Sequence, residues 1–198
     1  MEGRLLVLIH FAKKITFRKK EILVFLLLFH TVACKNQNIA IDFKIPNQLE
    51  KKPQEHGFLK MSSDFENYIY KHPYEHSLRI NLGSAQRELF ITVLERIFTN
   101  VHLKLPANQS GTTIVPELIN FELSKPKETG FAYYECRFEY LISLINRKEN
   151  KKHEISAYAR LADSFNQERN IIAKLVSQCM RVVASKLEIY LIENYVAG

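Results

Sequence analysis

The sequence predicts an α+β fold: a two-layer sandwich in which two helices cover one face of a mostly antiparallel sheet of four to five strands. Residues 132–144 and 153–161 alternate between apolar and polar side chains around a short charged turn, as the two strands of a hairpin do. Residues 85–98 and 165–195 carry apolar side chains on one face at helical spacing. Cleanly alternating strands leave one sheet face in water, so both helices are expected on the other face.

The first elements of the expected globular domain are a strand, a helix and a second strand. Residues 76–82 (HSLRINL) alternate, Gly83 turns the chain, and Ser84 is a natural N-cap for the helix over 85–98. Residues 101–105 (VHLKL) alternate again. A further strand spans roughly 113–123, and Pro116 near its start is typical of a strand edge or a bulge.

The hairpin and the last helix carry the clearest pattern. The small side chains of Ala157 and Ala159 would let the helix over 165–195 pack closely on the sheet. That helix of about 30 residues would be ~45 Å long. The side chains expected to face inward from the first strand are Ala132, Tyr134, Cys136, Phe138, Tyr140, Ile142 and Leu144.

The first 33 residues have the organisation of a signal peptide. A basic stretch at 13–20 (KKITFRKK) precedes an apolar run at 22–29 (ILVFLLLF) and the small-residue segment TVA before Cys34. The apolar run is shorter than the ~20 residues that cross a bilayer, which disfavours a transmembrane anchor. A buried helix of a soluble domain is disfavoured because the run is apolar all round. Residues 34–74 are polar and contain three prolines, so we expect a tether before a globular domain at 75–198.

The segment TVAC at 31–34 resembles the lipobox of bacterial lipoproteins. Val32 and Ala33 fit that pattern, whereas Thr31 replaces the usual Leu, Val or Ile. The resemblance implies that Cys34 is lipidated and becomes the first residue of a membrane-anchored protein. Lys35, in place of Asp, implies a periplasm-facing position at the outer membrane. Thr-x-Ala would also suit ordinary signal peptidase, and the product would then be a secreted, soluble periplasmic protein.

The body of the chain resembles small bacterial envelope lipoproteins. The features are INLGSAQRELFITVLERIF at 80–98 and the hairpin with its helix at 131–195. Such proteins include the lipopolysaccharide-assembly lipoprotein, auxiliary lipoproteins of ABC-type lipid transporters, and penicillin-binding-protein activators. The resemblance implies a non-enzymatic binding or assembly partner in envelope transport or biogenesis, with an envelope protein as its partner. It carries over no functional residue except Cys34.

The composition offers little for catalysis, cofactors or nucleic acid. Residues 1–33 hold a net charge of +4, which leaves +3 of the formal +7 for the rest, so nucleic acid is not an expected partner. Glycine is too scarce for a phosphate-binding loop, and no catalytic residue, cofactor or metal is expected. His72 and His76 lack the further ligands of a metal site, so we expect His72 in solvent and His76 on a strand face.

Two cysteines and one polar surface remain as candidate sites. Cys136 and Cys179 both point toward the predicted core, where they are either small hydrophobic side chains or, in an oxidising compartment, a disulfide. On the outward face of the hairpin, Tyr133, Arg137, Tyr158 and Arg160 form either a docking surface or an ordinary solvated face. An alternative to partner binding is a lipid or glycolipid carrier that holds an acyl chain between the sheet and the helices.

Overall fold

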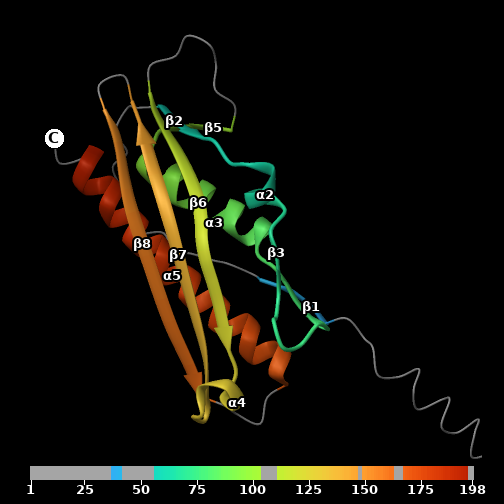
Figure 1. Ribbon diagram of the computed structural model, residues 1–198. Coiled ribbons are helices and arrows are strands. Elements are labelled where there is room, and N and C mark those ends of the chain that lie inside the picture. Colours follow the sequence, from blue (N-terminus) through green and yellow to red (C-terminus); the bar gives the residue numbers. More distant parts are fainter. Residues whose placement is uncertain (1–36, 42–55, 104–110, 147–148, 163–166, 196–198) are drawn as a thin grey trace, which may run out of the picture. The chain divides into compact units, whose positions relative to one another are not determined.

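A five-stranded sheet forms one layer of the fold (Figure 1). The computed structural model describes residues 37–41, 56–103, 111–146, 149–162 and 167–195. The strand order is β5-β2-β6-β7-β8, with β6, β7 and β8 antiparallel and β2 parallel to both β5 and β6. The strand bounds are Asn100–His102 for β5, His56–Leu59 for β2, Thr112–Ser124 for β6, Tyr133–Ile145 for β7 and Asn150–Ala162 for β8.

The hairpin formed by β7 and β8 alternates as the sequence predicts. Every second residue of β7 from Tyr134 to Leu144 is buried, and the residues between them are half-buried or exposed. Cys136 lies opposite Ala159, and Tyr140 lies opposite Ile155. One face of the hairpin therefore belongs to the core and the other faces solvent.

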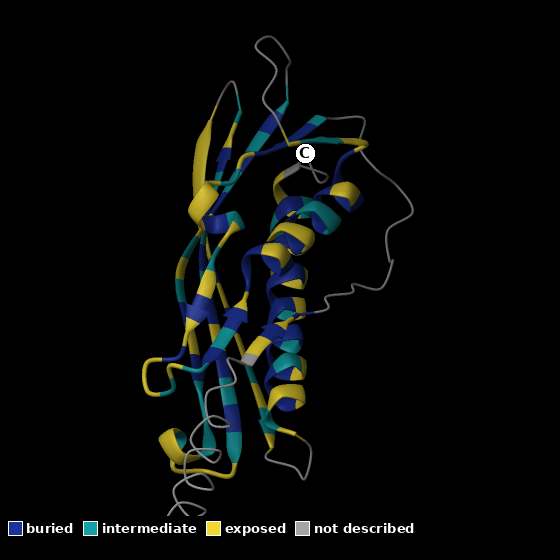
Figure 2. Ribbon diagram, turned by 90° about the vertical axis from the view of Figure 1, so that its right-hand side faces the viewer, coloured by how far each residue is buried: buried dark blue, intermediate teal, exposed yellow. Residues whose placement is uncertain are grey.

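Two long helices cover the buried face of this sheet. The helix α3 spans Gly83–Ile97 and the helix α5 spans Glu168–Tyr195. They contact each other, and α5 also packs along β7 and β8. Figure 2 shows their buried sides turned toward the sheet. The predicted α+β fold, with two helices on one face of a sheet, is confirmed.

A second, three-stranded sheet lies on the same side as the helices. It consists of β1 (Gln37–Ala40), β4 (Leu78–Asn81) and β3 (Ile69–Lys71), in the order β1-β4-β3. The ring of Tyr70 in β3 meets the ring of Phe121 in β6 edge-on, at 4.7 Å between centroids. The sequence places the strand over 76–82 in the main sheet, whereas β4 belongs to this second sheet.

Four described elements lie inside the stretch that the sequence predicts as a tether, residues 34–74. They are β1, β2, β3 and the short helix α2 at Ser63–Glu66. Phe65 of α2 is buried, and its ring meets those of Phe90 and Tyr140. The described parts of this stretch therefore contribute to the core.

The start of α3 is set by a tertiary contact. The helix begins at Gly83, one residue before the predicted N-cap Ser84, and Leu82 caps it without a side-chain hydrogen bond. The backbone N–H groups of Leu82 and Gly83 both donate to the carbonyl of Tyr68, at 3.1 and 3.0 Å. A Cβ atom on Gly83 would lie 2.1 Å from the carbonyl oxygen of Glu66, so this crossing requires glycine.

A buried polar chain joins the sheet to the helices. The hydroxyl of Tyr140 in β7 donates to Oε1 of Gln86 in α3 at 2.9 Å, and Nε2 of Gln86 donates to the carbonyl of Phe65 at 3.3 Å. Burial raises the pKa of Tyr140 far above its ordinary value, so the hydroxyl keeps its proton. These bonds fix the position of α3 against both β7 and α2.

Candidate functional site

The solvent face of the hairpin carries a stack of Arg160 with two tyrosines. The guanidinium of Arg160 lies 4.7 Å from the ring centre of Tyr133 and 4.8 Å from that of Tyr158. Its Nε atom also lies 3.2 Å from Oε2 of Glu135, which is directly opposite on β7. A cation held between two rings is a cation–π arrangement, and it restrains a side chain that would otherwise be flexible.

Three of the four residues predicted as a docking surface therefore come together, and Arg137 lies beside them. Arg137 is opposite Tyr158, but its guanidinium turns to Glu139, with 2.6 Å between Nη2 and Oε1. Phe131 extends the stack, because its ring lies parallel to that of Tyr133 at 5.3 Å. Phe131 is 63% exposed. Because it precedes β7, the alternating pattern of that strand does not predict its place in the stack.

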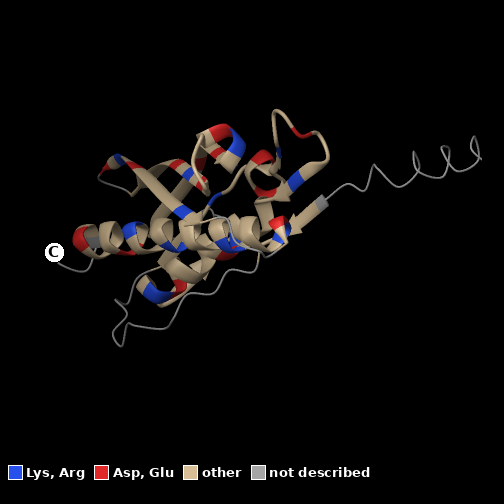
Figure 3. Cartoon of the chain, turned by 90° about the horizontal axis from the view of Figure 1, so that it is seen from below, with Lys and Arg blue, Asp and Glu red and all other residues tan. Residues whose placement is uncertain are grey.

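This aromatic cluster, defined here as Phe131, Tyr133, Tyr158 and Arg160, is suited to binding. Tyr158 is 42% exposed, so its ring adds little to the core. Tyrosine, phenylalanine and arginine are enriched at protein–protein interfaces. Over the described residues, lysine and arginine are interspersed with aspartate and glutamate (Figure 3).

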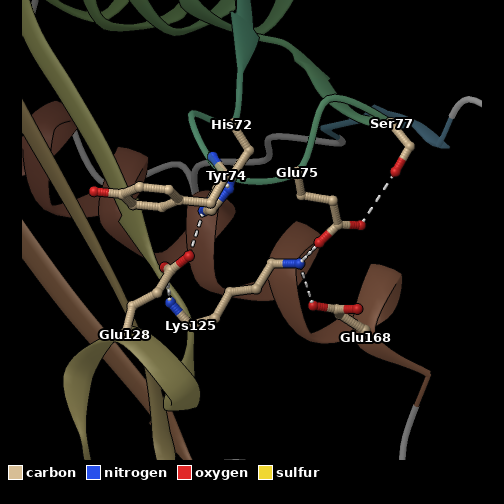
Figure 4. Close-up of polar contacts among 7 residues, drawn as sticks. All are labelled: His72, Tyr74, Glu75, Ser77, Lys125, Glu128 and Glu168. Atoms are coloured by element: carbon tan, nitrogen blue, oxygen red, sulfur yellow. Dashed lines mark hydrogen bonds and ion pairs between the residues drawn. The ribbon is translucent and has the colours of Figure 1, made fainter.

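A second polar cluster ties three chain segments together (Figure 4). Nζ of Lys125, which precedes the short helix α4 (Pro126–Thr129), contacts the carboxylates of Glu75 and Glu168, the latter at 2.7 Å. Burial lowers the pKa of Lys125, but the two carboxylates outweigh it, and the net pKa is raised. The hydrogen bond from Lys125 lowers the pKa of Glu75. Both shifts favour the charged forms of Lys125 and Glu75.

Neither histidine of HPYEH lies where the sequence predicts it, in solvent for His72 and on a strand face for His76. His72 is 1% exposed, whereas His76 is exposed and lies before β4 begins. The backbone N–H of Tyr74 points at Nδ1 of His72, and Nε2 lies 3.3 Å from Oε1 of Glu128. The turn between β3 and β4 folds onto α4, and this contact buries His72.

The described residues contain no group of three or more potential metal ligands. His56 and His102 form a pair, with 3.2 Å between Nδ1 of the first and Nε2 of the second. One ring donates a hydrogen bond to the other, and their rings stack at 5.4 Å. A structural zinc site takes four protein ligands, so this pair falls short of one.

Cys136 and Cys179 are free thiols that touch in the core. Both are fully buried, and Sγ of Cys179 donates to the carbonyl of Cys136 at 3.4 Å. Burial and the neighbouring thiol raise the pKa of Cys136 well above its ordinary value. A buried protonated thiol is a poor nucleophile. The disulfide between them remains a prediction.

The predicted signal peptide and Cys34 lie outside the described residues. Within the part of the chain that the structure describes, no helix is both long and apolar enough to cross a membrane.

The fold occurs in a bacterial protein of known structure. A crystal structure from Xanthomonas campestris, assigned to the family DUF330, matches with a TM-score of 0.51 and 12% identity, over 77% of this chain and 92% of that chain. The rare lipoprotein B from Shewanella oneidensis matches with a TM-score of 0.45 and 13% identity, over 72% of this chain and 97% of that one. No protein-family model and no curated protein matches the chain. The Xanthomonas protein shares the fold, and at this identity no residue role transfers.

Proposed function

We propose that this protein is a non-enzymatic lipoprotein of the bacterial envelope that binds a protein partner through the aromatic cluster. Cys34 carries the lipid anchor, and the body faces the periplasm at the outer membrane. The role is that of an accessory in transport or envelope biogenesis. The observation that carries the binding role is the stack of Arg160 between Tyr133 and Tyr158 on an open sheet face.

The stack favours binding over a purely structural role. Exposed ion pairs such as Arg160–Glu135 contribute little to stability, about 0–1 kcal/mol. Side chains held in one conformation lose less entropy when a partner arrives than mobile side chains do. Aromatic and arginine anchors of this type dominate the binding energy at many interfaces.

The anchor is tested by metabolic labelling with a clickable palmitate analogue. We expect the wild-type chain to be labelled and to fractionate with membranes, whereas Cys34→Ala remains unlabelled. A labelled Cys34→Ala chain, or an unlabelled wild type, contradicts the lipoprotein assignment. An unlabelled wild type that appears in the soluble periplasmic fraction would instead indicate ordinary secretion.

The binding surface is tested by photocrosslinking in cells. A photoreactive residue at position 158 is expected to crosslink to an envelope protein, and the same residue at Lys174, an exposed position of α5, serves as the matched control. Tyr158→Ala with Arg160→Ala should abolish co-purification of that protein. Crosslinks that come from position 174 and not from 158 would place the partner elsewhere.

The lipid-carrier alternative has less support from the described core. Side chains that would line an acyl site between the sheet and α5, such as Phe138, Ile172 and Leu175, are fully buried in the hydrophobic core. Mass spectrometry of non-covalent lipid extracted from the purified protein distinguishes the two functions. Stoichiometric lipid without any protein partner would favour the carrier.

A further inference from the structure

Strand β8 forms an open edge of the five-stranded sheet. It is 13 residues long, and β7 is its strand neighbour in the sheet order of the described residues. Nζ of Lys186 donates to the carbonyl of Ser156 at 2.6 Å, so this carbonyl faces the open side. Because successive residues of a strand turn their backbone groups to opposite sides, Glu154, Tyr158 and Arg160 also offer theirs at this edge. Such an edge is a template for another strand.

The charges along β8 are complementary to those of a second β8 strand running antiparallel. The even-numbered residues of β8 offer their backbone groups at the edge, so two such strands can hydrogen-bond only when even-numbered residues face each other. The registers that remain differ from one another by two residues. In one of them Glu154 lies opposite Arg160 of the second copy, and two-fold symmetry repeats the pair. A shift of two residues in one direction places Lys152 opposite Arg160, and a shift in the other places Glu154 opposite Ala162.

A hollow next to the β8 edge supports the register in which Glu154 lies opposite Arg160. It measures about 250 Å³, lies between β8 and α5, and is lined by His153, Ile155, Ile189 and Tyr190 among others. Ile189 is 55% exposed there. When Glu154 faces Arg160, Leu161 of the second copy lies opposite His153 on the inner side of the strand, at this hollow. An apolar side chain would thus cover exposed apolar surface.

We propose that two copies of this chain associate through antiparallel β8 strands, with Glu154 of each copy opposite Arg160 of the other. The two five-stranded sheets then continue across the interface as one. In the free chain Lys186 donates a hydrogen bond to the carbonyl of Ser156. In the dimer, a backbone N–H group of the second copy replaces Lys186 as the donor to this carbonyl. This pairing uses the edge of the sheet and shares Arg160 with the aromatic cluster. Glu154 and Lys186 lie outside that cluster, so their variants test the pairing without changing the proposed partner-binding surface.

Charge reversal of the full-length chain in detergent micelles tests the register, with sedimentation velocity as the measurement. Each of Glu154→Arg and Arg160→Glu places two like-charged pairs across the interface and should weaken the dimer about tenfold. An equimolar mixture of the two variants restores both opposite-charge pairs, so heterodimers should form with near wild-type affinity. Glu95→Arg, an exposed site on α3, is the charge-matched control and should leave the dimer unchanged.

A second variant changes association in the opposite direction. Lys186→Met removes the ammonium that competes for the carbonyl of Ser156, so the dimer should become a few-fold tighter. Circular dichroism confirms the fold of each variant, and Lys186→Met and Glu154→Arg provide the test if Arg160→Glu does not fold. A wild-type chain that stays monomeric at the highest concentration overturns the proposal. So does a mixture that fails to recover, or a weaker dimer in Lys186→Met.

Discussion

Replacing Lys125 with methionine should destabilise the fold by about 2 kcal/mol. The Lys125 side chain is 14% exposed and joins two carboxylates, whereas Glu75 and Glu168 are each about one-third exposed. Loss of one partner costs ~3–5 kcal/mol in a fully buried ion pair and ~0–1 kcal/mol in an exposed pair. Because both carboxylates keep part of their hydration, the expected loss lies between these limits. For a domain of this size it corresponds to a fall in Tm of roughly 4–8 °C.

The pH dependence of this loss follows from the shifted pKa values. The lowered pKa of Glu75 stabilises the fold above its ordinary value of 4.5, and this stabilisation disappears as the pH falls through the lowered pKa. The raised pKa of Lys125 stabilises the fold below its ordinary value of 10.5 and is lost as the pH rises beyond it. The difference in stability between wild type and variant should therefore be constant near neutral pH and shrink in acid.

Urea unfolding of both proteins between pH 7 and pH 3 is the assay. Lys127→Met, an exposed lysine two residues further along, is the matched control and should change stability by less than about 0.5 kcal/mol. A Lys125→Met variant as stable as wild type would refute the reasoning. A deficit that stays the same from pH 7 to pH 3 would show that lost packing, and not lost charge, is responsible.

Three further predictions concern residues in the core of the fold. Tyr140→Phe leaves Oε1 of Gln86 buried without its hydroxyl donor, so stability should fall by about 1–3 kcal/mol in chemical denaturation; an unchanged midpoint would mean the bond is absent. Gly83→Ala places a Cβ atom 2.1 Å from the carbonyl oxygen of Glu66 and should cost more than about 3 kcal/mol, measured as a fall in Tm; a stable variant would contradict this crossing of the backbone. Cys136 should resist alkylation at pH 9 until the protein unfolds, because burial raises its pKa. Thiol counting by mass spectrometry after expression in an oxidising compartment shows whether it has formed the predicted disulfide.

The predictable part of the fold lies where long elements carry a regular pattern. The strands β7 and β8 and the helix α5 repeat a period over 13 residues or more, and each period identifies a buried face. The strands β1, β2 and β3 have four residues or fewer, so no period develops. Their pairing depends on distant segments, such as His56 beside Asn100, and local sequence carries no signal for it.

The same limit applies to the candidate sites. Tyr133, Tyr158 and Arg160 could be grouped from alternation alone because hairpin register sets them near one another. The cluster around Lys125 joins residues 50 and 43 positions away along the chain, at Glu75 and Glu168, so no spacing rule indicates it. His72 likewise has a polar local sequence, and the fold of the β3–β4 turn decides its burial.

The position of β1 has a consequence for how far this protein reaches. β1 begins at Gln37, three residues after Cys34. Three residues of fully extended chain span at most about 11 Å, so an acylated Cys34 would hold the edge of the small sheet within that distance of the lipid headgroups. A long tether would let the folded domain move far from the membrane surface. This short connection would confine it to the bilayer surface and reduce its search for a partner to two dimensions. A compatible partner would present its binding site at the same membrane, close to the headgroups.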